Sequence, residues 1–471
     1  MDLRYWLDRA ITAVEDWESA YGPYEPHPSL DVTDDRLGAA LAELTGRLQD
    51  NYPFFHPRYA GQMLKPPHPA AVVGYLAAML INPNNHALDG GPATAEMEKS
   101  VVARLAGMFG YDTHLGHLTS SGTIANLEAL FVAREIHPDR GVAYSAEAHY
   151  THARMCRVLG LAGYEVAADA RGRMDLGALE ELLRTGKVGT VVVTAGTTGL
   201  GAIDPIDGVV DLKERYGVRV HVDGAYGGFY TLLAGADGAP DGTGARTGSF
   251  AAAGVVKDWG LDPAPWRAIA SCDSIVVDPH KHGLQPYGCG AVLFADPGVG
   301  RFYAHDSPYT YFTSDELHLG EISLECSRAG AAAAALWLTF ELLPPTPDGL
   351  GTVLGATRRA ALRFAELVAG SSELALFQPP ELDIVGYYRR SETLSDVDRE
   401  SVRMLGEGMA DEADPVFLST LRVSGSAFAA RGHDVVADAP GARILRGVLM
   451  KPEHESLVGE LHARIERLAA G

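Results

Sequence analysis

Ser274-Ile-Val-Val-Asp-Pro-His-Lys-His-Gly283 is an apolar run of strand character that ends at the pair His280-Lys281. A lysine just past a buried strand, between a proline and a glycine, stands in an unusual place for a solvated charge. Burial disfavours an ammonium group, and the unprotonated amine is the form that attacks carbonyl carbons. Lys281 is therefore a candidate Schiff-base lysine. The alternative is a strand-end lysine whose amine reaches solvent.

Short apolar runs of the same kind alternate with helical segments from residue 86 to residue 345. The further runs lie at 114–118, 141–144, 190–194, 218–222 and 290–294. Strands that are apolar on both faces and separated by helices are typical of a mainly parallel sheet covered by helices on each side. Sheets of this α/β class bind ligands at the carboxyl ends of their strands. We therefore look for chemistry at those ends.

The pattern divides the chain into three parts. Residues 1–85 read as helices and loops rich in proline and aromatic residues, and suit a dimerisation segment. Residues 86–345 form the predicted large domain, and residues 346–471 a smaller α+β domain.

Composition limits the partners. Lys and Arg number 39 against 61 Asp and Glu, and the resulting net charge of −22 argues against nucleic acid or an anionic membrane as main partner. No apolar run is long enough for a membrane span, and the N-terminus has no signal-peptide core. The four cysteines lie far apart without a CxxC pair, which favours reduced thiols over disulfides or a metal site. We expect a cytoplasmic protein without a metal.

The run at 114–118 leads into a turn of small residues and then a helix. Backbone N–H groups of Ser121, Gly122 and Thr123 at the start of that helix can bind a phosphate, assisted by the helix dipole. An ordinary helix N-cap is the alternative.

Asp223 ends the apolar run at 218–222. A lone carboxylate there would be costly unless it met a cation. A protonated pyridine nitrogen is such a cation, and its proton makes the ring an electron sink. Ala225 is small enough for a flat ring to lie against it. A capping aspartate is the alternative.

Two further strand ends carry candidate residues. His149 can stack on the ring and steer a substrate carboxylate, although nothing local separates it from His152. Thr197 and Thr198 can face the ring or the substrate, with turn formation as the alternative.

These motifs, in this order, resemble the pyridoxal-phosphate-dependent group II amino-acid decarboxylases, which have the aspartate-aminotransferase-like fold, fold type I. The set comprises Thr-Ser-x-Gly-Thr-x-Ala-Asn, Ser-x-x-x-His, Ala-Gly-Thr-Thr, His-Val-Asp-x-Ala-Tyr and Asp-Pro-His-Lys. The resemblance covers about residues 50–345 well and the rest more loosely. Asp278, where many members carry asparagine, makes the pattern most similar to the bacterial and archaeal tyrosine- or aspartate-decarboxylating branch.

The resemblance implies a role for each residue. Pyridoxal 5′-phosphate would bind through Lys281 and pair its ring nitrogen with Asp223. His149 and Ala225 would lie on opposite faces of the ring, the phosphate would bind at Ser121, Gly122 and Thr123, and His280 would lie beside the Schiff base. Thr197 and Asp278 complete the predicted cofactor site. Because a second anion is a poor phosphate ligand, we expect the Asp278 side chain to cap backbone N–H groups. Ser121 and Ile124 also depart from the glycine and glutamate usual in the family.

The implied enzyme is a carboxy-lyase that releases CO2 and an amine from an α-amino acid. In the resembling family a loop closes the site across a homodimer interface and returns a proton, often from a tyrosine. The matching segment, 305–315, contains Tyr309, Tyr311 and Phe312. If Phe312 takes the donor position, the protein would instead be a decarboxylating oxidative deaminase that forms an aldehyde. A catalytically silent scaffold is the third possibility.

The substrate is the least determined part. Arg328 is a candidate ligand for the α-carboxylate, with an exposed helix-start arginine as the alternative. The aromatic segment containing His56, Arg58 and Tyr59, together with Phe312, is a candidate lining for the substrate side chain. Its composition favours an aromatic amino acid, but such segments also pack at dimer interfaces.

Overall fold

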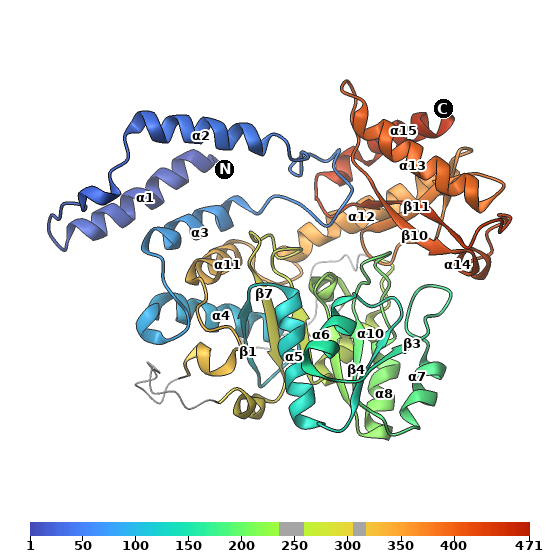
Figure 1. Ribbon diagram of the computed structural model, residues 1–471, viewed down its shortest axis with the longest axis horizontal. Coiled ribbons are helices and arrows are strands. Elements are labelled where there is room, and N and C mark those ends of the chain that lie inside the picture. The colour runs from blue at the N-terminus through green and yellow to red at the C-terminus, as the bar shows by residue number, and fades with distance from the viewer. Residues whose placement is uncertain (235–258, 305–316) are drawn as a thin grey trace.

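The computed structural model describes residues 1–234, 259–304 and 317–471, and its strands form two sheets (Figure 1). The larger sheet has seven strands in the order β1-β7-β6-β5-β4-β2-β3. They are β1 (Leu115–Thr119), β2 (Gly141–Ser145), β3 (Gly163–Val166), β4 (Val188–Thr194), β5 (Arg219–Asp223), β6 (Ser274–Val277) and β7 (Gly290–Phe294). The structure therefore confirms the six predicted strands.

Strand direction in this sheet is mainly parallel, as predicted. Strands β2 to β6 run parallel to one another, and β7 is antiparallel to both β6 and β1. Strand β3 is the one that the sequence did not predict. It lies at the edge of the sheet, and three of its four residues are at least partly exposed, so it has no apolar run.

Alternate residues of the central strands pack into separate cores on the two faces of the sheet. Ile275 and Val277 of β6 share a core with α4 (Pro92–Phe109), whereas Val276 packs with residues of α5 (Gly122–Ile136). Strand β4 follows the same rule, because Val191 and Val193 join the first core and Val192 faces α5. Helices thus cover both faces, which is why the strands are apolar on both sides.

The remaining helices of this region complete the two layers. They are α3 (Pro69–Ile81), α6 (Thr151–Leu159), α7 (Leu176–Leu183), α8 (Ile206–Tyr216), α9 (Thr231–Ala234), α10 (Pro263–Ala268) and α11 (Gly330–Leu342). Helix α11 packs between α3 and α4. Its contact with α3 is close at Gly74, which has no side chain. A Cβ atom there would lie only 3.0 Å from the carbonyl oxygen of Ala334.

The second sheet has four antiparallel strands in the order β10-β11-β9-β8. Its elements are β8 (Leu374–Leu376), β9 (Ile384–Arg389), β10 (Ser419–Ser424) and β11 (Gly441–Val448), with helices α12 (Leu350–Gly370), α13 (Leu394–Ala410), α14 (Gly425–Ala430) and α15 (His454–Ala470). The domain boundaries at residues 85 and 345 remain predictions.

The segment around residue 60 joins this second sheet. Ala60 donates its N–H to the carbonyl of Phe417, and its own carbonyl accepts the N–H of Val448. A segment from the start of the chain thereby becomes part of the C-terminal region.

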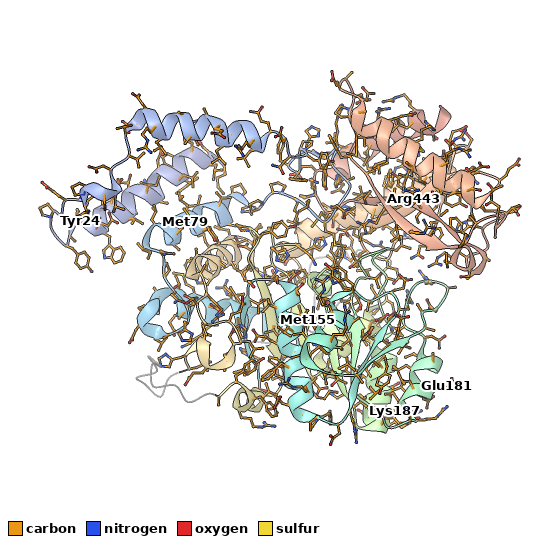
Figure 2. All side chains as sticks on the ribbon, in the orientation of Figure 1. Tyr24, Met79, Met155, Glu181, Lys187 and Arg443 are labelled. Atoms are coloured by element: carbon orange, nitrogen blue, oxygen red, sulfur yellow. The ribbon has the colours of Figure 1, made fainter. Side chains whose placement is uncertain are left out.

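Helices α1 (Leu3–Ser19) and α2 (Asp34–Leu48) bury no residue of their own. They lie side by side at one end of the molecule, where α1 rests on α3 (Figure 1). Figure 2 shows Tyr24, between the two helices, at the outer tip of this pair. None of the helices in the described ranges has the length and apolar character that a membrane crossing requires.

Candidate active site

The carboxyl ends of the parallel strands meet at one cavity, as this sheet class requires. Thr194 at the end of β4 is in register with Asp223 at the end of β5, and β6 leads directly into Asp278. The cavity has a volume of about 250 Å³. The predicted residues that line it are Ser121, Gly122, Thr123, His149, Thr198, Asp223, Ala225, Asp278, His280 and Lys281.

The first turn of α5 forms one end of this cavity. Ser121 is the N-cap residue, and its hydroxyl accepts the N–H of Ile124 at 3.3 Å. The N–H groups of Gly122 and Thr123 belong to the first helical turn, so they have no acceptor within the helix. These N–H groups and the positive end of the helix dipole suit an anion such as phosphate.

Glycine is required at two positions around this turn because segments of the chain approach each other closely there. A Cβ atom on Gly290 of β7 would lie 2.7 Å from the backbone carbon of Ser121. A Cβ atom on Gly122 would lie 2.6 Å from a carboxylate oxygen of Asp278. Both glycines therefore bring neighbouring strand ends up to the start of α5.

Asp223 is buried and paired with His152. The Nε2 atom of His152 lies 2.8 Å from Oδ2 of Asp223, and the N–H of Ala225 donates to Oδ1 at 3.2 Å. Burial by itself raises the pKa of Asp223, but the hydrogen bond and charge of His152 and the charge of Lys281 outweigh it and hold the pKa below its ordinary range. Asp223 therefore faces the cavity as a carboxylate, which can hold a proton on a pyridine nitrogen.

The structure separates the two histidines that the sequence left equivalent. His152 is completely buried and supports Asp223, whereas His149 is half-buried and lines the cavity. Burial lowers the pKa of His149, against the opposing effect of the Asp223 charge. A neutral imidazole with an accessible face is suited to lie on a flat cofactor ring.

Lys281 enters the cavity from the turn after β6 and forms an ion pair there. Its Nζ atom lies 3.0 Å from Oδ2 of Asp278, and its side chain keeps 21% of its surface exposed. The prediction that Asp278 caps backbone N–H groups is wrong. Its Oδ2 atom faces Lys281 and His280, and its buried Oδ1 atom has no hydrogen-bond partner. The lysine is the nearest cation and therefore takes the carboxylate.

Arg446 on β11 is a candidate residue that the sequence analysis did not find. It is buried, and it donates to the carbonyl of Thr198 at 2.7 Å, to Gln62 at 2.8 Å and to Ser419 at 3.1 Å. All three acceptors are uncharged, so this guanidinium pairs with no carboxylate in the described part of the chain. Thr198 itself lines the cavity. A buried cation beside a cavity is a candidate ligand for an anionic group.

Comparison with known proteins agrees with this geometry. Residues 54–235 match the family model described as the pyridoxal-dependent decarboxylase conserved domain. A probable L-aspartate decarboxylase of Halobacterium salinarum is 31% identical over 70% of this chain and 82% of its own length. An L-tyrosine decarboxylase of Enterococcus faecium is 28% identical over 82% of this chain and 77% of its own. The chain belongs to the pyridoxal-dependent decarboxylase family.

Solved structures agree on the fold of this decarboxylase. The crystal structure of mouse CSAD superposes with a TM-score of 0.76 at 20% identity, over 99% of this chain and 98% of that one. The α/β fold of type I and the cofactor, pyridoxal 5′-phosphate, follow from the family. The protein is a carboxy-lyase that acts on an α-amino acid.

The cavity of the decarboxylase fits this cofactor by its own chemistry. It has free N–H groups at one end, at the start of α5, and a buried carboxylate, Asp223, held by His152. The amine of Lys281 opens into the same space. These groups match a phosphate, a pyridine nitrogen and an aldehyde, respectively.

Thr197 does not line the cavity of the decarboxylase. Its hydroxyl accepts the N–H of Ala202 at 3.0 Å and its own N–H donates to the carbonyl of Ala202, so it closes the turn after β4. Thr198 lines the cavity instead. The turn alternative is therefore correct for Thr197.

Arg328 is committed to an internal ion pair. Its guanidinium donates to Glu98 at 2.6 Å and to the carbonyl of Leu118 at 2.7 Å, and only 8% of the side chain is exposed. Its charge is already neutralised beneath the start of the phosphate turn. The structure therefore gives Arg328 a structural contact in place of the predicted substrate carboxylate.

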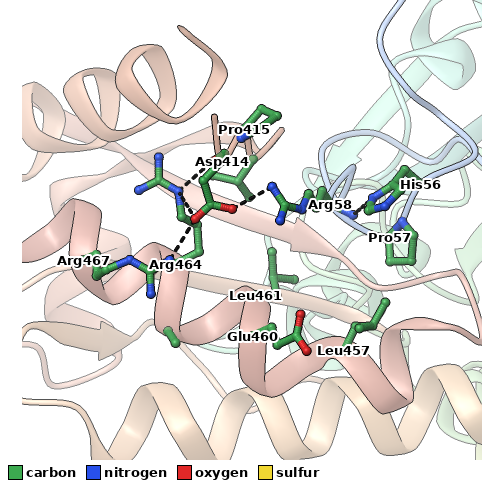
Figure 3. Close-up of a pocket in the computed structure, with 12 residues that line it drawn as sticks. His56, Pro57, Arg58, Asp414, Pro415, Leu457, Glu460, Leu461, Arg464 and Arg467 are labelled. Carbon is green, nitrogen blue, oxygen red and sulfur yellow. Dashed lines mark hydrogen bonds and ion pairs between the residues drawn. The ribbon is translucent and has the colours of Figure 1, made fainter. Parts of the chain in front are cut away.

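The predicted substrate segment lies at a different pocket, of about 470 Å³, between residues 56–58, residues 414–416 and α15 (Figure 3). Arg58 pairs there with Asp414 at 2.6 Å, and His56 lines the same pocket. Tyr59 is buried and packs against Phe54 and Phe417. The predicted approach of these residues to Lys281 is thus not found within one chain.

Three predicted residues cannot be placed. Tyr309, Tyr311 and Phe312 lie outside the described residues.

Proposed function

We propose that the protein decarboxylates an aromatic L-amino acid, with L-tyrosine as the first candidate, and that the cavity at Lys281 is where it does so. The observation that carries this proposal is that Lys281 and the buried Asp223 line one cavity, with Asp223 held by His152 from behind. An L-tyrosine decarboxylase is among the relatives of the chain.

When bound, the cofactor supplies a ring that accepts the electrons of the breaking bond between Cα and the carboxylate. Asp223 holds a proton on the pyridine nitrogen, and His152 keeps the Asp223 carboxylate ionised and oriented. Lys281 presents its amine to the aldehyde carbon of the cofactor. His149 and Ala225 line the space for the flat ring, and the N–H groups at the start of α5 hold the phosphate.

Arg446 is proposed to bind a carboxylate of the substrate. A guanidinium whose protein partners are all uncharged retains its full charge for a ligand, and a bidentate contact would also orient the substrate. The same observation favours a second substrate candidate, L-aspartate, because a dicarboxylate offers an additional anion. A probable L-aspartate decarboxylase is also among the relatives.

Protonation of the product at Cα remains the task predicted for Tyr309 or Tyr311. The sequence position of these tyrosines, between the turn at Lys281 and α11, supports this assignment. If Phe312 takes the donor position instead, the product is an aldehyde and ammonia.

One assay tests these assignments together. The purified protein, supplied with pyridoxal 5′-phosphate, is offered L-tyrosine, L-aspartate and the other common amino acids, and CO2, amine, aldehyde and peroxide are measured. We expect CO2 and amine in equal amounts from L-tyrosine. Amine from L-aspartate alone would select the second substrate. Aldehyde with peroxide would overturn the assignment of a tyrosine donor, and no turnover of any amino acid would overturn the proposal.

We also propose a homodimer built through α1 and α2. Four leucines of α2 recur at spacings of four, three and four residues, and each exposes more than half of its surface: Leu37, Leu41, Leu44 and Leu48. Tyr5, Trp6 and Trp17 of α1 are also exposed. An apolar stripe of this length needs a partner, and a second copy supplies the same stripe. Sedimentation of Leu41→Glu/Leu44→Glu is expected to give a monomer.

A cytoplasmic location remains part of the proposal. Cys156, Cys272 and Cys289 are buried free thiols, which suits a reducing compartment. Cell fractionation checks this location.

A further inference from the structure

Asp278 places a second carboxylate at the end of the cavity assigned to the phosphate. Its carboxylate oxygens lie 2.6 and 2.7 Å from where a Cβ atom of Gly122 would stand, in the first turn of α5. The side chain is 4% exposed, and Oδ1 has no hydrogen-bond partner. A phosphate ester carries close to two negative charges at neutral pH, so an ionised Asp278 would oppose it.

The Lys281 ammonium compensates this carboxylate at 3.0 Å. When Lys281 Nζ bonds to the aldehyde carbon of the cofactor, the aldehyde oxygen leaves as water with two of the three ammonium hydrogens. The nitrogen keeps its charge but only one hydrogen, which is no longer free to serve Asp278 as well as the ring. Asp278 would then be left with a weaker contact to Lys281 just as a phosphate arrives.

His280 is the nearest group that can share a proton with Asp278. Its Nδ1 atom lies 2.8 Å from the carbonyl oxygen of Cys289, which can only accept, so Nδ1 carries the hydrogen of the neutral ring. The lone pair of Nε2 therefore faces the Asp278 carboxylate at 3.5 Å. A single proton between these two acceptors would convert a repulsive contact into a hydrogen bond.

We propose that Asp278 and His280 form a proton-holding pair that takes up one proton from solvent when the phosphorylated cofactor binds. This inference rests on the proposed function, because it requires the phosphate at the start of α5. The proton brings the charge of the pair from −1 to zero. Asp278 is thus compatible with the phosphate once the pair has taken up a proton. An asparagine at this position is already neutral and would need no proton.

The other titratable groups around Asp278 do not compete for this proton. Burial raises the pKa of Cys289 and of Tyr287, so both are already protonated. Burial lowers the pKa of His149, so its ring stays neutral beside the pair. Lys281, the remaining neighbour, is bonded to the cofactor.

The test compares two ligands that bond to Lys281 and differ only in phosphate. Calorimetric binding of pyridoxal 5′-phosphate and of pyridoxal, in buffers of different ionisation heat at about pH 8, gives the number of protons taken up. For the wild type we expect about one more proton with the phosphorylated ligand. For Asp278→Asn we expect the same number of protons to be taken up with either ligand. The dissociation constant of pyridoxal 5′-phosphate should then rise about tenfold more per pH unit for the wild type than for the variant.

Asp398→Asn is the matched control, because Asp398 pairs with Arg443 at 2.5 Å in the C-terminal region. It should retain the proton uptake of the wild type, and thermal unfolding of each variant confirms that it is folded. Equal proton uptake by the wild type with the two ligands would overturn this inference alone. A difference in proton uptake that persists in Asp278→Asn would do the same. A wild type that gains no visible absorbance with pyridoxal 5′-phosphate would overturn the proposed function as well.

Discussion

Two pockets in the described part of the chain, one at Arg58 and one at Lys281, differ in how their charges are matched. In the larger pocket, at Arg58, every arginine meets a carboxylate: Asp414 receives Arg58, Arg464 and Arg467, and its side chain is 36% exposed (Figure 3). In the smaller cavity, at Lys281, the charges are buried and incompletely matched, since Asp278 keeps an unpartnered oxygen.

This difference shows why volume is a poor guide to a functional site. The larger pocket is about 470 Å³ and the smaller about 250 Å³. Exposed ion pairs contribute little to stability and need no ligand. Buried polar groups without a full set of partners are found where a ligand supplies the missing partner. The comparison therefore predicts large effects from substitutions at the smaller cavity and small effects at the larger pocket.

The largest effect is expected from Lys281→Ala. The variant loses the amine that bonds to the cofactor, so decarboxylation should fall by about 10⁴-fold or more and the visible absorbance of the bound cofactor should disappear. Steady-state kinetics and absorbance spectra measure both. Lys187→Ala, which removes an exposed lysine, is the control and should match the wild type. Retained absorbance in Lys281→Ala would place the Schiff base elsewhere.

Asp223→Asn is expected to lower kcat by about 10²- to 10³-fold, because a neutral amide no longer holds a proton on the pyridine nitrogen. The substitution keeps the size of the side chain and one contact to His152. Cofactor binding, measured by absorbance, should persist. An unchanged kcat would show that the buried carboxylate serves the fold and not the reaction.

Arg446→Met is expected to raise KM by about 10- to 100-fold, since a charged hydrogen-bond donor contributes about 1.5–3 kcal/mol. Arg443, labelled in Figure 2, lies on the same strand, β11, where it pairs with Asp398 and does not line the cavity. Arg443→Met should therefore leave KM near the wild-type value. Equal changes in both variants would indicate a general effect on β11 in place of a substrate contact.

His454 lies behind the larger pocket, where its Nε2 atom contacts the carbonyl of Pro57 at 2.9 Å. Burial and then the charge of Lys451 lower its pKa from 6.5 to about 4. A lowered pKa means that the neutral ring stabilises the fold fully above pH 6.5 and that this stability is lost as the pH falls toward about 4, by about 3 kcal/mol at most.

The corresponding variant is His454→Gln, which keeps a donor for Pro57. Its free energy of unfolding, measured in urea, should decrease less between about pH 7 and pH 4.5 than that of the wild type. Parallel curves for the two proteins would contradict the role of His454 in this pH dependence.

The smallest effect is expected at the centre of the larger pocket. Arg58→Ala should change the free energy of unfolding by about 1 kcal/mol or less, because its ion pair with Asp414 is partly exposed, and kcat/KM should stay within about twofold. Denaturation in high salt should reduce even this difference. A large loss of activity would instead bring the segment at residues 56–58 back into the substrate site.

The sequence predicted most of what depends on local pattern. Apolar runs identified six strands of the large sheet, and the motifs identified ten residues that the structure brings together in one cavity. Strand β3 escaped prediction because an edge strand with exposed residues carries no such run. Thr197 and Thr198 are adjacent in the same motif, and only the geometry of the turn separates their roles.

Contacts between distant segments could not be read from the chain. His152 reaches Asp223 across 71 positions, and Arg446 reaches Thr198 across 248. Neither pairing leaves a local signal, because the partners meet only after the sheets are assembled. Conversely, Arg328 and Tyr59 carry promising side chains, but Arg328 pairs with Glu98 and Tyr59 packs against Phe54.

The sequence by itself determined the parallel sheet, the lysine at the end of β6 and the turn at the start of α5, because strand period, burial and turn chemistry act over a few residues. The tertiary structure alone decided which histidine supports Asp223, that Arg446 reaches Thr198 beside the cavity, and that Asp278 faces Lys281 next to the turn of α5. Those outcomes depend on which charges are buried together, and burial is a property of the assembled molecule.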